Sequence, residues 1–422
     1  MNPLEPALAV ANAVLYEGYI LFPYTASAKK NRIRWQFGVV VPQAYAALGS
    51  GEPSVSQTEV LLQAGNGTRV TVVVRFLQVE TRWIQVRAGP EFETVESVEI
   101  DGRRYVSFDE GIEREIEVPV DPFGPPTAAP IAFADEERVE PLGEAAARVV
   151  RRRWPLHGSV TVKCEPVAGD RQLRKLRVCV ANQSAVVPGE RSSALRTAFV
   201  STHTLLYAEG GRFLSVLDPP PEAQLETPAL RNRHTWPVLV GDETADAQRS
   251  PLVLSSPIIL YDFPAVAPQS QGDTFDATEI DELMMLSVRS LSDAEREEAR
   301  ATDPRARAIV DRAERFGAQE LTDLHGVLDI PSMDCVFVKG EKIAKGSIVR
   351  LHPKRRADVW DEFLEGKTAT VRAIHQDVEN QMYVAVTVDD DPASDLHDWY
   401  GRSLFFYPDE VEPVSMVSER SS

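Results

Sequence analysis

A segment from Leu254 to Gly317 divides the chain into two parts that follow different patterns. It opens with an apolar run, continues through the proline-spaced residues 262–271, and ends in two short stretches of high helix propensity at 294–300 and 305–316. Residues before this divider alternate as strands do, and the pattern after Gly340 is typical of a small barrel. The sequence therefore predicts a mainly β protein of the α+β class with one short helical segment.

Capping signals predict where the helices of the divider begin and end. Asp276 and Ser292 are each followed three residues later by glutamate, which is the form of a capping box. Asp303 is an N-cap residue before a proline at the first helical position, and Gly317 is placed to end the last helix. We interpret the acidic residues here as helix caps rather than metal ligands, because their spacing lacks the glycine of a calcium-binding loop.

Two strand-rich, sandwich-like domains are predicted before the helices, at residues 1–130 and 140–262. In the first domain, strand-like runs flank the turn sequences at 65–67 and 101–102. The proline- and glycine-rich stretch at 121–130 closes this domain and is expected to be a linker.

The second domain is expected to contain both a helix and strands. An amphipathic helix is predicted at 142–152, and the arginines at its carboxyl end would complement its dipole. Strands are predicted at 158–166 and 173–182, followed by a hairpin that turns at the two glycines 210–211. The strand pattern places the cysteines of this domain in its core.

Two further regions complete the predicted organisation. Residues 263–325 are expected to form an extended linker and short helices, and residues 340–414 an SH3-like small barrel of four short strands. From Gly340 to Pro413 the chain has nine Lys or Arg against fifteen Asp or Glu, so this barrel is acidic. A basic patch within it comprises Arg350 and residues 354–356. Because the barrel as a whole is acidic, we interpret this patch as a site of protein interaction rather than RNA binding.

Charge and composition bound the class of protein. The formal net charge is −19, which argues against a nucleic-acid partner, because nucleic-acid binders usually carry a basic face. No apolar run approaches the ~18–20 residues that span a bilayer, so membrane insertion is not expected. The amino terminus lacks the basic region of a secretory signal, and we expect a cytoplasmic protein.

The sequence gives no catalytic or metal-binding signature. Cys164, Cys179 and Cys335 are widely spaced, and the seven histidines lack ligand spacing, so we predict no metal and no cofactor. Ser201 and His203 share one strand face without facing each other, and no nucleophile elbow surrounds the serine. We therefore predict no catalytic residues.

The segment from Tyr16 to Val41 is the candidate site for binding a partner. It places a tight basic cluster among aromatic residues in an otherwise acidic chain, and residues 33–37 alternate as a strand would. One interpretation is a core strand with a solvated basic face. The other is a docking surface for an acidic partner, in which cations attract the partner and aromatic side chains anchor it. The predicted contact residues are Tyr19, Phe22, Tyr24, Lys29, Lys30, Arg32, Arg34 and Trp35.

Three passages together resemble a known family. Residues 16–45, 254–282 and 346–392 are similar to uncharacterised proteins encoded beside bacterial uptake NiFe hydrogenases and their maturation genes. The last passage, with 405–414, also resembles a carboxyl-terminal extension of some hydrogenase maturation proteases. The nickel-gripping aspartates of those proteases have no counterpart here, so the resemblance does not imply their activity.

The resemblance implies a non-catalytic accessory protein that acts by protein–protein binding. Its role would be assembly, maturation or scaffolding of a NiFe hydrogenase, with hydrogenase subunits or maturation factors as partners. One alternative is a stable structural subunit of a hydrogenase complex. Another is a hydrolase-type enzyme whose site is assembled from dispersed residues.

Overall fold

The protein, described here by a computed structural model, has two compact units, residues 1–316 and 317–422. The structure describes residues 4–32, 34–143, 146–185, 189–242, 246–266, 270, 272–276, 281–317, 335–353, 364–376, 382–388 and 404–414. Strands dominate both units and helices are few, which confirms the predicted mainly β, α+β class.

One strand, β1 (Val55–Ala88), forms the centre of a twelve-stranded sheet in the first unit. Five strands pair with it in antiparallel fashion along its 34 residues: β10, β11, β5, β8 and β2. Because β5 precedes residue 130 and β10 follows residue 140, the predicted boundary there does not separate two domains. The stretch at 121–130 leads from β5 into β6 within one sheet.

The other members of this sheet run in the order β12–β14–β11–β1–β10–β9–β6, with the remaining strands paired off this path. Their bounds are β2 (Glu91–Val95), β5 (Phe108–Val120), β6 (Thr127–Phe133), β7 (Glu136–Leu142), β8 (Ala147–Arg153), β9 (Leu156–Val167), β10 (Asp170–Asn182), β11 (Val200–Leu214), β12 (Trp236–Val240), β13 (Arg249–Ser250) and β14 (Leu252–Ser256). A separate hairpin, β3 (Ser97–Ile100) and β4 (Arg103–Val106), turns at the predicted Asp101–Gly102.

The predicted turn at Gly65–Gly67 is a bulge inside β1. Ala64 pairs with Gly211 and Arg69 with Glu209, so β1 inserts extra residues against the same partner strand. The Thr68 hydroxyl accepts a hydrogen bond from the Gly65 N–H (3.0 Å) and donates one to the Gly210 carbonyl (2.9 Å). The glycines therefore interrupt the ladder without reversing the chain.

The helix predicted at 142–152 is also wrong, because these residues end β7 and form β8. Alternate residues Ala147 and Val149 enter a core cluster with Ile84 of β1, as period-two spacing requires. The arginines of β8 are balanced by carboxylates on neighbouring strands rather than by a helix dipole. Arg151 and Arg153, for example, lie within ion-pair distance of Glu80.

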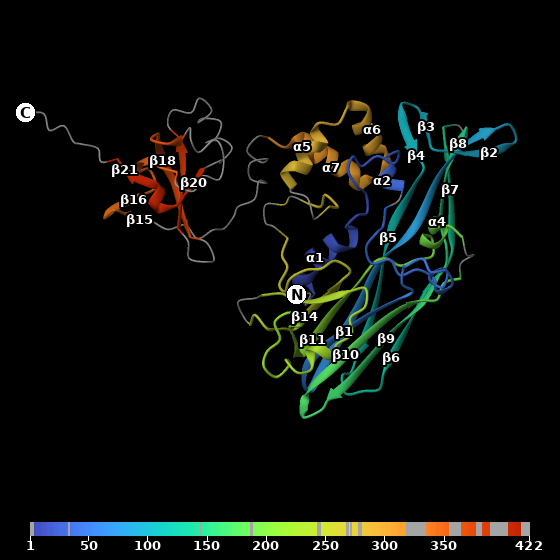
Figure 1. Cartoon of the computed structure of the whole chain (residues 1–422). Helices are drawn as coiled ribbons and strands as arrows, with labels where there is room; N and C mark the ends of the chain where they lie inside the picture. Colours follow the sequence, from blue (N-terminus) through green and yellow to red (C-terminus); the bar gives the residue numbers. More distant parts are fainter. Residues whose placement is uncertain are drawn as a thin grey trace, which may run out of the picture. The chain divides into compact units, whose positions relative to one another are not determined.

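Helices cover parts of this unit. The helix α1 (Glu5–Tyr16) buries Ala7, Ala11 and Val14 against the face of β11 and β14 that lies opposite the main core. The shorter helices are α2 (Lys29–Arg32), α3 (Gln43–Ala46), α4 (Arg191–Leu195) and a 3₁₀ turn, η1 (Thr227–Ala229). Three helices, α5 (Asp281–Arg289), α6 (Asp293–Thr302) and α7 (Pro304–Arg315), gather beside β3 and β4 (Figure 1).

The caps of α6 and α7 confirm two sequence predictions. Ser292 and Glu295 form a reciprocal capping box at the start of α6. The Asp303 carboxylate accepts a hydrogen bond from the Arg305 N–H at 2.7 Å and caps α7. Gly317 directly follows Phe316, the C-cap residue of α7. The capping box predicted for Asp276 and Glu279 includes a residue outside the described ranges.

The second unit has its own apolar core. A five-stranded antiparallel sheet runs in the order β20–β19–β18–β17–β21, and a hairpin accompanies it. Buried valines and leucines of these strands form one cluster. The bounds are β15 (Cys335–Val338), β16 (Glu341–Ala344), β17 (Ile348–Leu351), β18 (Thr368–Gln376), β19 (Met382–Val388), β20 (Leu404–Phe406), η2 (Pro408–Glu410) and β21 (Val411–Pro413). The SH3-like barrel stays a prediction.

We expect the caps to differ in their contribution to stability. Ser292→Ala removes one exposed cap and should cost about 1 kcal/mol of the free energy of unfolding. Asp303→Ala should cost more, about 2 kcal/mol, because its buried carboxylate also accepts a hydrogen bond from the Tyr19 hydroxyl, with the two oxygens 2.9 Å apart. Urea denaturation followed by circular dichroism measures both. Ser287→Ala, within α5, is the control, and equal costs for all three variants would contradict the capping assignment.

We also expect residues 335–414 to fold without the first unit, because their strands share a core of their own. An isotope-labelled fragment with these bounds should give a dispersed amide spectrum. A narrow, poorly dispersed spectrum would contradict this prediction.

Candidate functional site

The predicted basic cluster lies on and beside α2, at the surface of the first unit. Lys29, Lys30 and Arg32 are exposed, as a docking surface requires. The buried Asn31 holds the loop before them in place, because its side-chain amide accepts from the Leu21 N–H and donates to the carbonyls of Leu21 and Thr25. The three exposed cations therefore project from an ordered turn.

Most of the predicted aromatic anchors are buried inside the protein. Tyr19, Tyr24 and Trp35 expose at most 3% of their surface, and Phe22 is half-buried. Residues 34–37 form no strand, and Trp35 has a left-handed backbone with φ of 64°. The prediction that these three rings anchor a partner is therefore wrong for the folded protein. Sequence alternation does not reveal that this segment folds back onto β5.

Arg34 is buried as well and is held by rings and carbonyls. Its guanidinium carbon lies 3.7 Å from the centroid of the Phe108 ring and 4.3 Å from that of Trp35. It donates hydrogen bonds to the carbonyl oxygens of Tyr19 (2.6 Å) and Asp109. Burial lowers the pKa of Arg34, and its neighbours Tyr19 and Asp109 oppose that lowering. Arg34 is thus a structural cation rather than a partner contact.

The same segment fastens the helices to the sheet. The Tyr19 hydroxyl donates to Asp303 at the start of α7 and accepts from the Gly111 N–H of β5 at 3.1 Å. Burial raises the pKa of Tyr19, so this hydroxyl keeps its proton. The Tyr24 hydroxyl donates to the Thr274 carbonyl at 2.8 Å. The aromatic residues of the segment therefore stabilise the protein's own tertiary structure.

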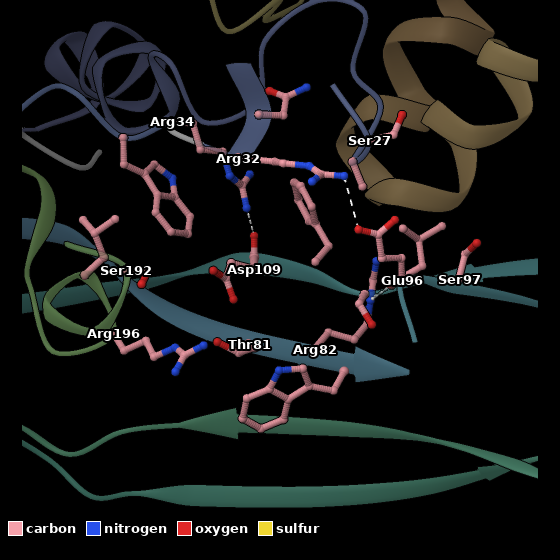
Figure 2. A pocket seen from close by; sticks show the side chains of 18 of the residues that line it. Ser27, Arg32, Arg34, Thr81, Arg82, Glu96, Ser97, Asp109, Ser192 and Arg196 are labelled. Carbon is pink, nitrogen blue, oxygen red and sulfur yellow. Dashed lines mark hydrogen bonds and ion pairs between the residues drawn. The ribbon is translucent and has the colours of Figure 1, made fainter. Parts of the chain in front are cut away.

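A cleft of about 780 Å³, which we call the tryptophan cleft, opens beside this segment. Trp35, Trp83 and Phe108 contribute aromatic surface. Figure 2 shows Arg34 reaching toward Asp109, with Thr81 and Arg82 on the strand below and Arg196 beside Thr81. The charged residues that line it are Arg32, Arg34, Arg82, Arg104, Arg191, Arg196, Glu96, Asp109, Glu190 and Glu298.

Several of these arginines are committed to ion pairs. Arg32 pairs with Glu96 at 3.3 Å, in an exposed pair that contributes little to stability. Arg104 pairs with Glu298 of α6 at 3.6 Å. Arg82 is buried on β1 and contacts Glu110, and it also donates to the carbonyls of Val106 (2.9 Å) and Thr302 (2.6 Å).

A second cleft, of about 490 Å³, shares Arg82, Arg104 and Val106 with the first. We call it the arginine cleft, because seven arginines line it against three carboxylates. Two of them, Arg103 and Arg307, are exposed and form no ion pair with a carboxylate of the described residues. The charged residues are Arg82, Arg103, Arg104, Arg151, Arg300, Arg305, Arg307, Glu110, Glu140 and Asp303.

Sequence reasoning missed most of the residues that line the clefts. They come from β1, the β3–β4 hairpin, β5, α4, α6 and α7, and no local pattern brings such distant segments together. One signal was available in β1, where Thr81 and Arg82 follow a run rich in valine. A charged residue inside an apolar strand is buried only when it is paired, and therefore marks a polar site.

The histidine and cysteine side chains weighed above as catalytic or metal-binding candidates form no catalytic group among the described residues. His203 is buried, its Nδ1 lies 2.9 Å from the Ser201 carbonyl oxygen, and its Nε2 has no hydrogen-bond partner among the described residues. Cys164, Cys179 and Cys335 are free thiols, and burial raises the pKa of the first two. Among the described residues, no group of three His, Cys, Asp or Glu side chains is placed to hold a metal ion.

None of the described helices is long and apolar enough to cross a membrane. Comparison of the chain with protein-family models, curated proteins and solved structures found no match. The resemblance to hydrogenase-linked proteins therefore stays a prediction.

The buried histidine predicts a specific pH dependence of stability. Burial lowers the pKa of His203 to about 4, whereas an unfolded chain has a histidine pKa of about 6.5. Between these values the unfolded state binds a proton that the folded state excludes, so stability falls as pH falls. The loss from about pH 6.5 to pH 4 should be roughly 3 kcal/mol.

We expect His203→Gln to remove this contribution and to flatten the stability–pH profile in that window. Urea midpoints at several pH values measure the profile. His157→Gln, at an exposed histidine, is the matched control and should leave the slope unchanged. Parallel profiles for wild type and His203→Gln would show that His203 does not carry the effect.

Proposed function

We propose that this chain is a non-catalytic accessory protein that binds an acidic protein surface at the two clefts of the first unit. The observation that supports it is the arginine-rich lining of both clefts in a chain of net charge −19. The described residues that line the two clefts include no histidine, cysteine or lysine. Arginine is the cation best suited to a protein interface, because its planar guanidinium pairs with carboxylates in a fixed geometry.

Electrostatics make this region the place where an acidic partner can approach. The chain as a whole carries an excess of carboxylates, whereas three exposed arginines line the clefts: Arg32, Arg103 and Arg307. Lys29 and Lys30 lie on α2 with Arg32. At physiological salt the Debye length is about 8 Å, so the attraction acts close to contact. These exposed cations should therefore raise the association rate and its salt dependence.

The sequence resemblance supports a NiFe hydrogenase subunit or maturation factor as the partner. In this proposal the protein is cytoplasmic and acts in assembly, maturation or scaffolding, and it binds neither nucleic acid nor membrane. The strand-rich second unit is proposed as an SH3-like docking module. The first unit supplies the charged clefts.

The exposed cluster can be tested without damage to the fold. We expect Lys29→Glu, Lys30→Glu and Arg32→Glu combined to slow association with an acidic hydrogenase component roughly tenfold at low salt. Arg34 is left unchanged, because reversing its buried charge would unfold the segment. Co-expression with hydrogenase subunits and maturation factors, affinity capture and surface plasmon resonance give the partner and its rates.

A matched control reverses Arg69, Arg212 and Arg233, which are exposed and line neither cleft. This variant should bind as the wild type does, and circular dichroism checks that both variants fold. Equal losses of association rate in the two variants would mean that the effect depends on the net charge of the protein and not on the position of the cations. Recovery of no hydrogenase component by the wild type would contradict the assembly role.

A further inference from the structure

Asn66 and Gly67 lie at the tip of the bulge in β1 and take no part in the ladders of the sheet. The ladder with β11 breaks between Ala64 and Arg69, and neither β10 nor β5 pairs with the residues between them. Asn66 and Gly67 are both exposed to solvent. The backbone of this dipeptide therefore lacks the pairing that restrains the rest of the strand.

The side-chain amide of Asn66 is also unrestrained, unlike those of the other asparagines in the described ranges. Four of these use their amides in hydrogen bonds at 2.7 to 3.2 Å. They are Asn12, Asn31, Asn182 and Asn232. The Asn66 amide forms no hydrogen bond with a described residue. It can therefore rotate toward the backbone that follows it.

The residue that follows Asn66 leaves room for this approach. Gly67 has a φ of 92°, a conformation that glycine adopts without strain. Apart from its chain neighbours, no described atom lies within 4 Å of the point where a Cβ would stand. Each of the other four asparagines precedes a residue with a side chain: Ala13, Arg32, Gln183 and Arg233. Only at Asn66, among these five, is the next backbone nitrogen unshielded.

We propose that Asn66 is a site of spontaneous deamidation in the folded protein. Asparagine is a thermolabile residue. The Gly67 backbone nitrogen attacks the side-chain carbonyl carbon of Asn66, and a C–N bond forms. The amide nitrogen of Asn66 takes up the Gly67 proton and leaves as ammonia, so that a five-membered succinimide ring remains. Water then opens this ring at either carbonyl and gives aspartate or isoaspartate. Water is the one co-reactant, and nothing is oxidised or reduced.

The reaction changes the charge and the backbone of the bulge. It adds one carboxylate to a chain of net charge −19, next to the exposed Arg69. In the isoaspartate product the main chain gains one methylene group between residues 66 and 67. Because these residues have no ladder partner, the longer backbone breaks no strand pair. Asn66 lines neither cleft, so this proposal is independent of the proposed function.

Incubation of the full chain at mildly alkaline pH tests the proposal, with peptide mass spectrometry as the measurement. The peptide that contains Asn66 should gain the mass of an amide-to-acid conversion, and electron-transfer fragmentation should identify both aspartate and isoaspartate. A synthetic peptide of residues 61–72, incubated alongside, gives the rate without the fold. We expect the folded protein to react within about tenfold of this peptide, because the bulge adds little to the barrier.

Two variants and four internal controls accompany the measurement. Asn66→Gln has a side chain one methylene longer and should accumulate the acidic form at least about tenfold more slowly. Asn66→Asp carries the charge of the product and should migrate with the modified wild type on isoelectric focusing. In the same digests, the four hydrogen-bonded asparagines should stay amides. Circular dichroism verifies that the chain remains folded throughout.

Three results would overturn the proposal. The first is an Asn66 amide that stays intact in the folded chain while the peptide converts. The second is an acidic form that accumulates equally fast in wild type and in Asn66→Gln. The third is conversion of Asn182 or Asn232 as fast as that of Asn66, because opening of the whole sheet, rather than the geometry of the bulge, would then set the rate.

Discussion

The antiparallel pairing of β1 with five other strands is the interaction on which the first unit depends. Strands that precede residue 130 and strands that follow residue 140 complete their backbone hydrogen bonds on the same central strand. Either group alone would leave one edge of its strands unpaired, and an exposed strand edge invites pairing with another chain. The unit must therefore fold as a whole, through contacts that are far apart in the sequence, which predicts slow folding.

The far end of β1 is where the apolar core gives way to buried charge. Glu80 is 3% exposed and lies within ion-pair distance of Arg138, Arg151 and Arg153. Arg82 follows two residues later and binds the carbonyls of two other elements. Buried ion pairs add little net stability, because desolvation offsets their attraction, but breaking one is costly. The structure of this end of the sheet thus depends on each buried charge having its ion-pair or hydrogen-bond partner. Both clefts are lined by Arg82 from this end of β1.

Local signals in the sequence predicted local structure correctly. The capping box at Ser292 and the N-cap at Asp303 depend on neighbours within three residues, and the structure has both. Long-range pairing escaped prediction, because nothing near Gly65 or at residues 142–152 shows which strand lies alongside. The burial of Tyr19 and Trp35 escaped it for the same reason. A mixture of rings and cations is typical of both a docking surface and a folded-over segment.

The segment from Tyr16 to Val41 links the structural and the binding roles of this region. Its residues Arg34 and Trp35 form a wall of the tryptophan cleft, while Tyr19 and Tyr24 hold α7 and the segment that precedes α5. A partner bound at the tryptophan cleft would lie against this segment and the end of β1, which both line it. Binding to the folded state alone stabilises every contact that forms the site. A partner would therefore strengthen the attachment of the helices to the sheet as it binds.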